Sequence, residues 1–235
     1  MARIFSSRRH LLAGAAGSLL VSAPALADTR RQATPKKKTA EAVPVTPTED
    51  LMREHGVLQR ILLIYEAGSL RVSQGEDIDP AVFSMAAETM RDFIHDYHEK
   101  SEEEHVFPRF KKAGRMVELV DVLQVQHTAG RKLTERILQT AEASRGSKEQ
   151  RAAMTDAIQA SITLYRPHAA REDTNIFPTL RSLMTPNEFE ELGETLEKAE
   201  VAKFGGDGFE KMAKRVEQIE KRIGTDDLAQ ATPKN

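Results

Sequence analysis

The sequence contains no cysteine, which removes several kinds of chemistry at once. Disulfide bonds, thiolate nucleophiles, cysteine-bound zinc and iron–sulfur clusters all require that residue. Any metal ion held by side chains must therefore be bound by histidine, aspartate or glutamate. The absence of cysteine does not by itself identify the redox compartment in which the protein works.

Aromatic residues are scarce as well, since they make up 5% of the chain and tryptophan is missing. Runs that alternate Val, Ile or Thr with polar residues, the pattern of β-strands, do not stand out. Ala, Glu, Leu, Lys, Arg and Met dominate instead, and these residues favour helices. The 235-residue chain is 40% hydrophobic and 30% charged, which is typical of a globular protein, and we expect an all-α fold.

The apolar run from Leu11 to Ala23 is too short and too rich in Gly and Ala to span a bilayer as a stable helix. It follows the pair Arg8-Arg9 and leads into Ala-Leu-Ala at residues 25–27, an A-x-A cleavage pattern. Residues 1–27 therefore resemble a bacterial twin-arginine signal peptide, with an ordinary secretory signal as the alternative. The favoured interpretation predicts a periplasmic protein without stable membrane insertion after cleavage.

The charge balance argues against a nucleic-acid partner. The chain has 34 Lys and Arg against 36 Asp and Glu, and residues 1–27 contain three arginines and no acidic residue. The mature chain would thus carry 31 basic and 36 acidic residues, a formal charge of −5. Residues 28–45 contain proline, threonine and a lysine run with little to bury. We expect a disordered linker there, although its lysines could contact anionic lipid or phosphate.

Capping patterns mark the starts of helices in the rest of the chain. Thr46-Pro47-Thr48-Glu49 combines an N-cap residue, a first-turn proline and a glutamate three residues after the cap, and Thr185-Pro186-Asn187-Glu188 repeats it. Asp79-Pro80 marks a third start, and Ser147 with Gln150 and Asp207 with Glu210 predict further capping boxes. We expect helices over residues 47–71, 80–112, 115–144, 148–183, 186–203 and 208–223.

The first four helices are long and have short connections, which predicts an antiparallel four-helix bundle over residues 46–183. Two additional C-terminal helices, within residues 184–225, would pack on the bundle, and residues 226–235 would form a flexible tail. The last helix is amphipathic, so it could also mediate dimerisation, although a cap on the bundle is the favoured interpretation.

One histidine replaces an apolar residue on the core-facing stripe of each long helix. These histidines are His55, His98, His127 and His168. Two of them open similar blocks, HEKSEEEHVFP from His98 and HAAREDTNIFP from His168, each with a glutamate four residues later and Phe-Pro at the end. Residues four apart share a helix face, so Glu102 and Glu172 should also point inward.

Two buried carboxylates that face each other require a cation or a proton between them. Burying an unpaired carboxylate costs several kcal/mol, and the sequence offers too few inward lysines or arginines to neutralise two of them. Two divalent cations would do so, with two histidines for each ion and both glutamates as bridges. Imidazole and carboxylate donors without thiolates suit iron or manganese, and zinc would also fit.

The quoted blocks, together with His55 and His127, resemble the hemerythrin-like family in its bacterial HHE cation-binding branch. The resemblance covers roughly residues 47–183 and implies a four-helix bundle around a non-haem di-iron centre. It implies the metal ligands His55, His98, Glu102, His127, His168 and Glu172. Oxygen-carrying hemerythrins have HxxxH on one helix, whereas His127 is followed by Arg131 at that spacing, which argues against reversible oxygen carriage. Relatives that repair iron centres carry a cysteine-containing N-terminal segment that this chain lacks.

We therefore expect an exported di-iron protein that binds or senses dioxygen, peroxide or nitric oxide. A di-iron oxidase or peroxidase, an iron-buffering protein and a metal-free interaction bundle are the alternatives. Some neighbouring residues have open roles. Glu99 is either an additional ligand or a solvated surface residue, and His95 and Tyr165 either contact the ligands or only pack in the core. His105 is left out of the ligand set, and Pro108, Pro167 and Pro178 are expected to bend or end their helices.

Overall fold

Helices and the short connections between them make up the part of the chain that the structure describes, which is residues 45–229 and 232–233 of a computed structural model. No strand occurs in these residues, so the expectation of an all-α protein is confirmed there. The predicted signal, residues 1–27, lies outside the described residues, as does the predicted linker except for Val45. Residues from Thr46 onward form one compact unit. No helix among the described residues has the length and apolar character needed to cross a membrane.

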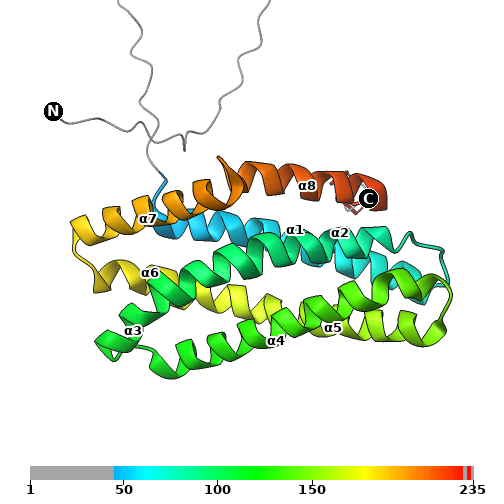
Figure 1. The fold of residues 1–235 in the computed structure, drawn as a ribbon, viewed down its shortest axis with the longest axis horizontal. Helices are drawn as coiled ribbons and strands as arrows, with labels where there is room; N and C mark the ends of the chain where they lie inside the picture. Colours follow the sequence, from blue (N-terminus) through cyan, green and yellow to red (C-terminus); the bar gives the residue numbers. More distant parts are fainter. Residues whose placement is uncertain (1–44, 230–231, 234–235) are drawn as a thin grey trace, which may run out of the picture. The chain divides into compact units, whose positions relative to one another are not determined.

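Four long helical segments come first along the chain (Figure 1). The first is α1, Pro47–Ser73, and the third is α4, Val117–Ala141, which ends in the 3₁₀ turn η3, Glu142–Arg145. The second runs without a break through α2, η1, η2 and α3, and the fourth runs through α5, η4, α6 and η5. The bounds of these eight elements are Ala81–Thr89, Met90–Glu99, Glu102–Val106, Phe107–Ala113, Lys148–Arg171, Glu172–Ile176, Phe177–Leu180 and Arg181–Leu183.

Two further helices follow, α7 at Pro186–Phe204 and α8 at Gly208–Ile223. The ends of all six helical segments agree with the sequence-based expectation to within two residues. The capping boxes expected at Thr46 and Thr185 are both present. At Ser147 and Asp207 the cap side chain accepts the backbone N–H three residues later, while no reciprocal bond from the third residue accompanies it.

The long segments pack side by side, and their contacts place one histidine of each at a common level. Helix α4 lies against α5 and α2, and α1 lies against α5 and α2. The apolar core consists of two clusters, one with Leu58, Ile61 and Phe83 and one with Leu51, Phe107 and Leu123. In α1, His55 stands between Leu51 of the second cluster and Leu58 of the first. Each of the other segments also changes from one cluster to the other near its histidine, so the histidine level is a polar layer between two apolar regions.

The Phe-Pro marks of the two repeated blocks coincide with π-helical turns. Phe107 N–H donates to the Glu102 carbonyl and Phe177 N–H donates to the Glu172 carbonyl, five residues back in each case. A proline has no N–H, and its ring collides with the carbonyl four residues earlier in a regular α-helix. The wider π turn is a register change that avoids this collision. Pro108 and Pro178 therefore shift the helix register without ending the helix.

The C-terminal helix α8 lies along α1 and α2, while α7 contacts α1 (Figure 1). The apolar side of α8 adds Val216, Ile219 and Ile223 to the larger core cluster. Its polar contacts include Arg60 Nε of α1, 2.8 Å from Glu220 Oε1, and Arg215 Nη2, 2.7 Å from Glu88 Oε2 of α2. The amphipathic tail helix thus covers the outer surface of the first two long segments.

Two glycines of α1 allow a test of this packing. A Cβ built on Gly68 would lie 2.6 Å from the Phe83 ring and 3.1 Å from Ile223, whereas nothing lies within 4 Å of one built on Gly56. We expect Gly68→Ala to lower the melting temperature, because overpacking costs about 1–3 kcal/mol, which exceeds the gain of about 1 kcal/mol from helix propensity. Gly56→Ala, the control, should raise it. Equal shifts in thermal unfolding would contradict this arrangement of α1, α2 and α8.

Candidate metal centre

The six residues singled out in the sequence lie together inside the protein. None of their side chains is more than 3% exposed; they are His55, His98, Glu102, His127, His168 and Glu172. The ring atoms that converge are the Nε2 nitrogens. His55 Nε2 lies 3.0 Å from His98 Nε2, and His127 Nε2 lies 3.2 Å from His168 Nε2. The first two long segments, called the first hairpin, thus contribute one close imidazole pair. The third and fourth long segments, called the second hairpin, contribute the other.

The two carboxylates lie between these imidazole pairs. Glu172 Oε2 is 3.0 Å from His168 Nε2 and 3.3 Å from His55 Nε2, so this residue touches both pairs. Glu102 also reaches both, with its oxygens 3.5 Å from His127 Nε2 and 3.6 Å from His98 Nε2. All four carboxylate oxygens are buried, and none has a hydrogen-bond partner.

The donor atoms form two groups that could each hold a metal ion. One group is His55, His98, Glu102 and Glu172, and the other is His127, His168 and Glu172. Within a group the donor atoms all lie within 4.8 Å of one another. Glu172 belongs to both groups, so the two positions are adjacent and share a carboxylate. The structure therefore brings together every residue that the sequence indicated as a ligand.

The spacing of the nitrogens fits metal coordination. A histidine–metal bond of about 2.1 Å, as found for zinc, places two nitrogens at right angles about 3.0 Å apart. The measured separations are 3.0 and 3.2 Å. Buried carboxylate oxygens without a hydrogen-bond partner are costly, and a cation is the partner they accept most readily. The donor set and its geometry thus fit two cations.

The outward ring nitrogen of each histidine has a hydrogen-bond acceptor of its own. His55 Nδ1 lies 2.8 Å from Asp173 Oδ1, and His98 Nδ1 lies 2.7 Å from Glu54 Oε2. His127 Nδ1 lies 2.9 Å from Glu103 Oε1, and His168 Nδ1 lies 3.0 Å from Gln126 Oε1. An acceptor at Nδ1 keeps the proton on that nitrogen, so the Nε2 lone pair points at the centre.

These four acceptors were not foreseen from the sequence, although their positions repeat. Glu54 and Gln126 directly precede the first histidine of each hairpin, and each binds the second histidine of its own hairpin. Glu103 and Asp173 directly follow the two glutamates, and each binds the first histidine of the other hairpin. A search for polar residues at matching offsets from the histidines and glutamates would have found them.

The metal-free protein holds protons at the centre. Burial alone would lower the pKa of His55, but its hydrogen bond to Asp173 and the negative charge of Glu172 beside it raise that pKa to about 9. Burial and the neighbouring His55 hold the pKa of His98 well below its ordinary value. Burial, with the charge of Glu172, raises the pKa of Glu102 well above its usual range. The pKa of Glu172 is lowered despite burial, because His168 and His55 contact it.

Glu99 lies in a separate buried network and in neither group of donor atoms. Tyr165 Oη donates to Glu99 Oε1 at 2.8 Å, and His95 Nδ1 lies 3.1 Å from the same oxygen. Burial would raise the pKa of Glu99, but hydrogen bonds from His95 and Tyr165, with the charges around it, lower it to about 2. Arg131 Nη2 is 3.1 Å from Glu99 Oε2, so a partly exposed guanidinium pairs with the second oxygen of this buried carboxylate.

The other residues whose roles the sequence left open lie outside both donor groups. His95 Nε2 lies 2.8 Å from Thr134 Oγ1, so both of its nitrogens have partners outside the donor groups. Gly130 allows the close approach of Tyr165, because a Cβ there would lie 1.8 Å from the phenol oxygen. The side chain of His105 is 32% exposed and lies outside both donor groups. Helix α5 continues through Pro167 without ending.

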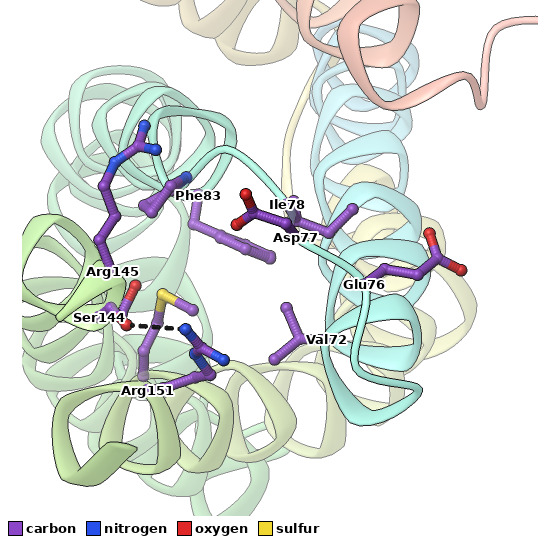
Figure 2. A pocket seen from close by; sticks show the side chains of 10 residues that line it. Val72, Glu76, Asp77, Ile78, Phe83, Ser144, Arg145 and Arg151 are labelled. Atoms are coloured by element: carbon purple, nitrogen blue, oxygen red, sulfur yellow. Dashed lines mark hydrogen bonds between the residues drawn. The ribbon is translucent and has the colours of Figure 1, made fainter. Parts of the chain in front are cut away.

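Two surface depressions of the described residues lie away from the centre. Figure 2 shows one of them, which is lined by Val72, Phe83, Arg151 and neighbouring side chains. Val72 is seventeen residues beyond His55 in α1, which corresponds to about 25 Å along the helix axis. A second depression, lined by Arg71, Asp79 and Arg222, lies at the same end. These pockets are remote from the histidine layer.

Comparison with known proteins gives one family. Residues 46–180 match the family Hemerythrin, described as the hemerythrin HHE cation binding domain. The chain is 43% identical over 236 residues to an uncharacterized protein of Mycobacterium tuberculosis strain H37Rv, Rv1995, and to one of Mycobacterium bovis, Mb2018. These alignments cover 96% of this chain and 91% of each relative. No solved structure matches the chain.

The pKa shifts predict how pH affects the metal-free protein. The pKa of His55 is raised from 6.5 to about 9, so its stabilisation is complete below pH 6.5 and is lost as pH rises towards 9. Glu102, whose pKa is also raised, acts in the same direction. Metal binding requires the deprotonated forms. The difference in melting temperature between metal-loaded and metal-free protein should therefore widen from pH 6.5 to 9.

Asp173→Asn is the control for this measurement, since it removes a carboxylate that raises the pKa of His55. Thermal unfolding of this variant without metal should depend less on pH over the same window. A constant difference between loaded and metal-free wild-type protein would contradict the assigned protonation.

Proposed function

The chain belongs to the hemerythrin family of HHE cation-binding domains, and from that premise we propose that it is an exported non-haem di-iron protein. In this proposal the long segments form a hemerythrin-like four-helix bundle, and the bundle holds two iron ions. The protein binds or senses dioxygen, peroxide or nitric oxide. The ligands are His55, His98, Glu102, His127, His168 and Glu172.

The observation that supports the proposal most directly is the set of orphaned oxygens at the centre. Four carboxylate oxygens are buried without a hydrogen-bond partner, next to four imidazole nitrogens oriented towards them. A fold stabilised by apolar packing alone would not retain two such carboxylates, because each costs several kcal/mol when unpaired. Two cations of charge +2 remove this cost.

The donor types favour iron or manganese, with zinc as a further fit. Imidazole and carboxylate donors bind first-row divalent ions, and thiolates, which favour copper(I), are missing from the chain. Of these metals, iron supplies redox chemistry with dioxygen, peroxide and nitric oxide. The residues of this chain hold the ions, fix the histidine tautomers through Nδ1 and shield the centre from water.

Burial of the centre favours a small ligand over a large substrate. The six proposed ligands are at most 3% exposed, and a molecule that reaches them must pass between packed helices. Three partly exposed side chains contact the buried histidines directly, and they are Glu103, Asp173 and Gln126. Dioxygen, peroxide and nitric oxide are small enough for such a path, which supports the binding role over an oxidase with a larger substrate.

Removal of single ligands tests the metal assignment. His98→Ala or Glu172→Ala should lower the metal content of anaerobically purified mature protein from two ions per chain, and should lower the melting temperature with it. His105→Ala is the matched control, because His105 lies outside both donor groups. Metal quantification together with optical spectra before and after air gives the readout. Wild-type metal content in both ligand variants would overturn the assignment.

Export is the second part of the proposal. The twin-arginine pathway carries folded proteins, so the protein would load its metal before it reaches the periplasm. Replacement of Arg8 and Arg9 by lysine should retain the precursor in the cytoplasm, while Arg3→Lys, the control, should not. Cell fractionation checks the result, and periplasmic mature protein from the double variant would refute the twin-arginine interpretation.

A further inference from the structure

We infer that the two metal positions are unequal and that the position at His55 and His98 binds its ion first and more tightly. This inference rests on the proposed metal-binding function and goes beyond it. Position A is defined here by His55, His98, Glu102 and Glu172, and position B by His127, His168 and Glu172. Glu102 lies in the group of position A, and its Oε2 also comes within 3.5 Å of His127 Nε2, so the two positions differ mainly in the residues behind their histidines.

The hydrogen-bond acceptors behind the histidines differ in the same direction. In position A both acceptors are carboxylates, Asp173 at 2.8 Å and Glu54 at 2.7 Å. In position B one acceptor is the neutral amide of Gln126, at 3.0 Å from His168 Nδ1. A carboxylate at the Nδ1 proton makes the imidazole a more basic ligand, and loss of such a partner lowers metal affinity about 10–100-fold.

Glu103 is the carboxylate behind His127 in position B, and it is shared with the positively charged guanidinium of Arg131. Glu103 Oε1 accepts from His127 Nδ1 at 2.9 Å and also from Arg131 Nη2 at 2.8 Å. The guanidinium competes for the electron density that would otherwise strengthen His127. Its positive charge also opposes a second cation nearby. The amide of Gln126 and the sharing of Glu103 with Arg131 therefore both weaken position B relative to position A.

Burial increases the effect of the Glu54 and Gln126 difference. The Glu54 side chain is 1% exposed, whereas Gln126 is partly exposed to solvent. A charge in the interior acts through a lower effective dielectric constant than one near water. Glu54 and Gln126 hold equivalent places before the first histidine of each hairpin. The presence of an amide at one place and a carboxylate at the other therefore accounts for most of the difference in metal affinity between the two positions.

The consequence is a defined order of filling. At limiting iron the protein holds one ion in position A, and the second ion is the exchangeable one. A protein that releases and regains the ion at B while A stays filled passes between one-ion and two-ion forms. This gives the centre a way to respond to iron supply in addition to a diatomic ligand.

Anaerobic calorimetric titration of metal-free protein with ferrous iron tests the order. Wild-type protein should bind two ions in two separate phases. Glu54→Gln should weaken the first phase by at least about tenfold, because it removes the carboxylate behind His98. Gln126→Glu should strengthen the second phase and leave the first unchanged. Glu66→Gln, at an exposed position of the same helix α1, is the matched control and should change neither.

Two equal positions that merely repel each other would give a different pattern. The first ion would then fill whichever position is intact, so Glu54→Gln would leave the first phase unchanged and weaken the second. Gln126→Glu would then strengthen the first phase. Either result, or two indistinguishable ions in wild-type protein, overturns the inference and leaves the metal function standing. Binding of no ion overturns the proposed function and the inference with it.

Discussion

Two carboxylates held at the same level inside the protein, with no hydrogen bond to any of their oxygens, are the constraint on which the structure depends. Such groups are tolerated only when positive charge stands next to them, from protons or from metal ions. The metal-free protein uses protons, since the pKa of His55 and that of Glu102 are both raised. The apolar core divides into two clusters around this layer, so the helices are stabilised by packing on either side of it.

An approximate twofold repeat supplies the layer. Each hairpin provides two histidines and one glutamate, and each also provides two acceptors that orient the imidazoles. Two acceptors act within their hairpin and two act across to the other, which ties the halves together at the centre. The repeat is broken where Gln126 stands in place of a carboxylate and where Arg131 shares Glu103, and these departures make the two positions chemically distinct.

Membership of the hemerythrin HHE family and the geometry of the donors point to the same chemistry. Arg131, four residues after His127, contacts Glu99 and Glu103, so its side chain is engaged in the network beside the centre. The deep burial of the six donor residues is consistent with the proposed small ligand, since none of them is more than 3% exposed.

The six candidate ligands could be grouped from the sequence because helical geometry is periodic. A histidine at a core position of each long helix, with a glutamate four residues later in two of them, has only one face on which to lie. The helix starts after Thr46 and Thr185 were predicted from capping boxes, which require particular residue types at fixed spacing. Glu99 shows the limit of this reasoning, since it was taken for either a ligand or a surface residue and instead lies in a buried network with Tyr165 and Arg131.

Sequence by itself thus determined which side chains face the interior and that their charges need compensation, because both follow from spacing along single helices. Only the tertiary structure decided which acceptor lies behind each histidine, as with Asp173 and His55, which are 118 residues apart. It also decided that Pro108 and Pro178 continue their helices through π turns. These features depend on how one helix is rotated and shifted against another, and that relation is not encoded in the periodicity of either.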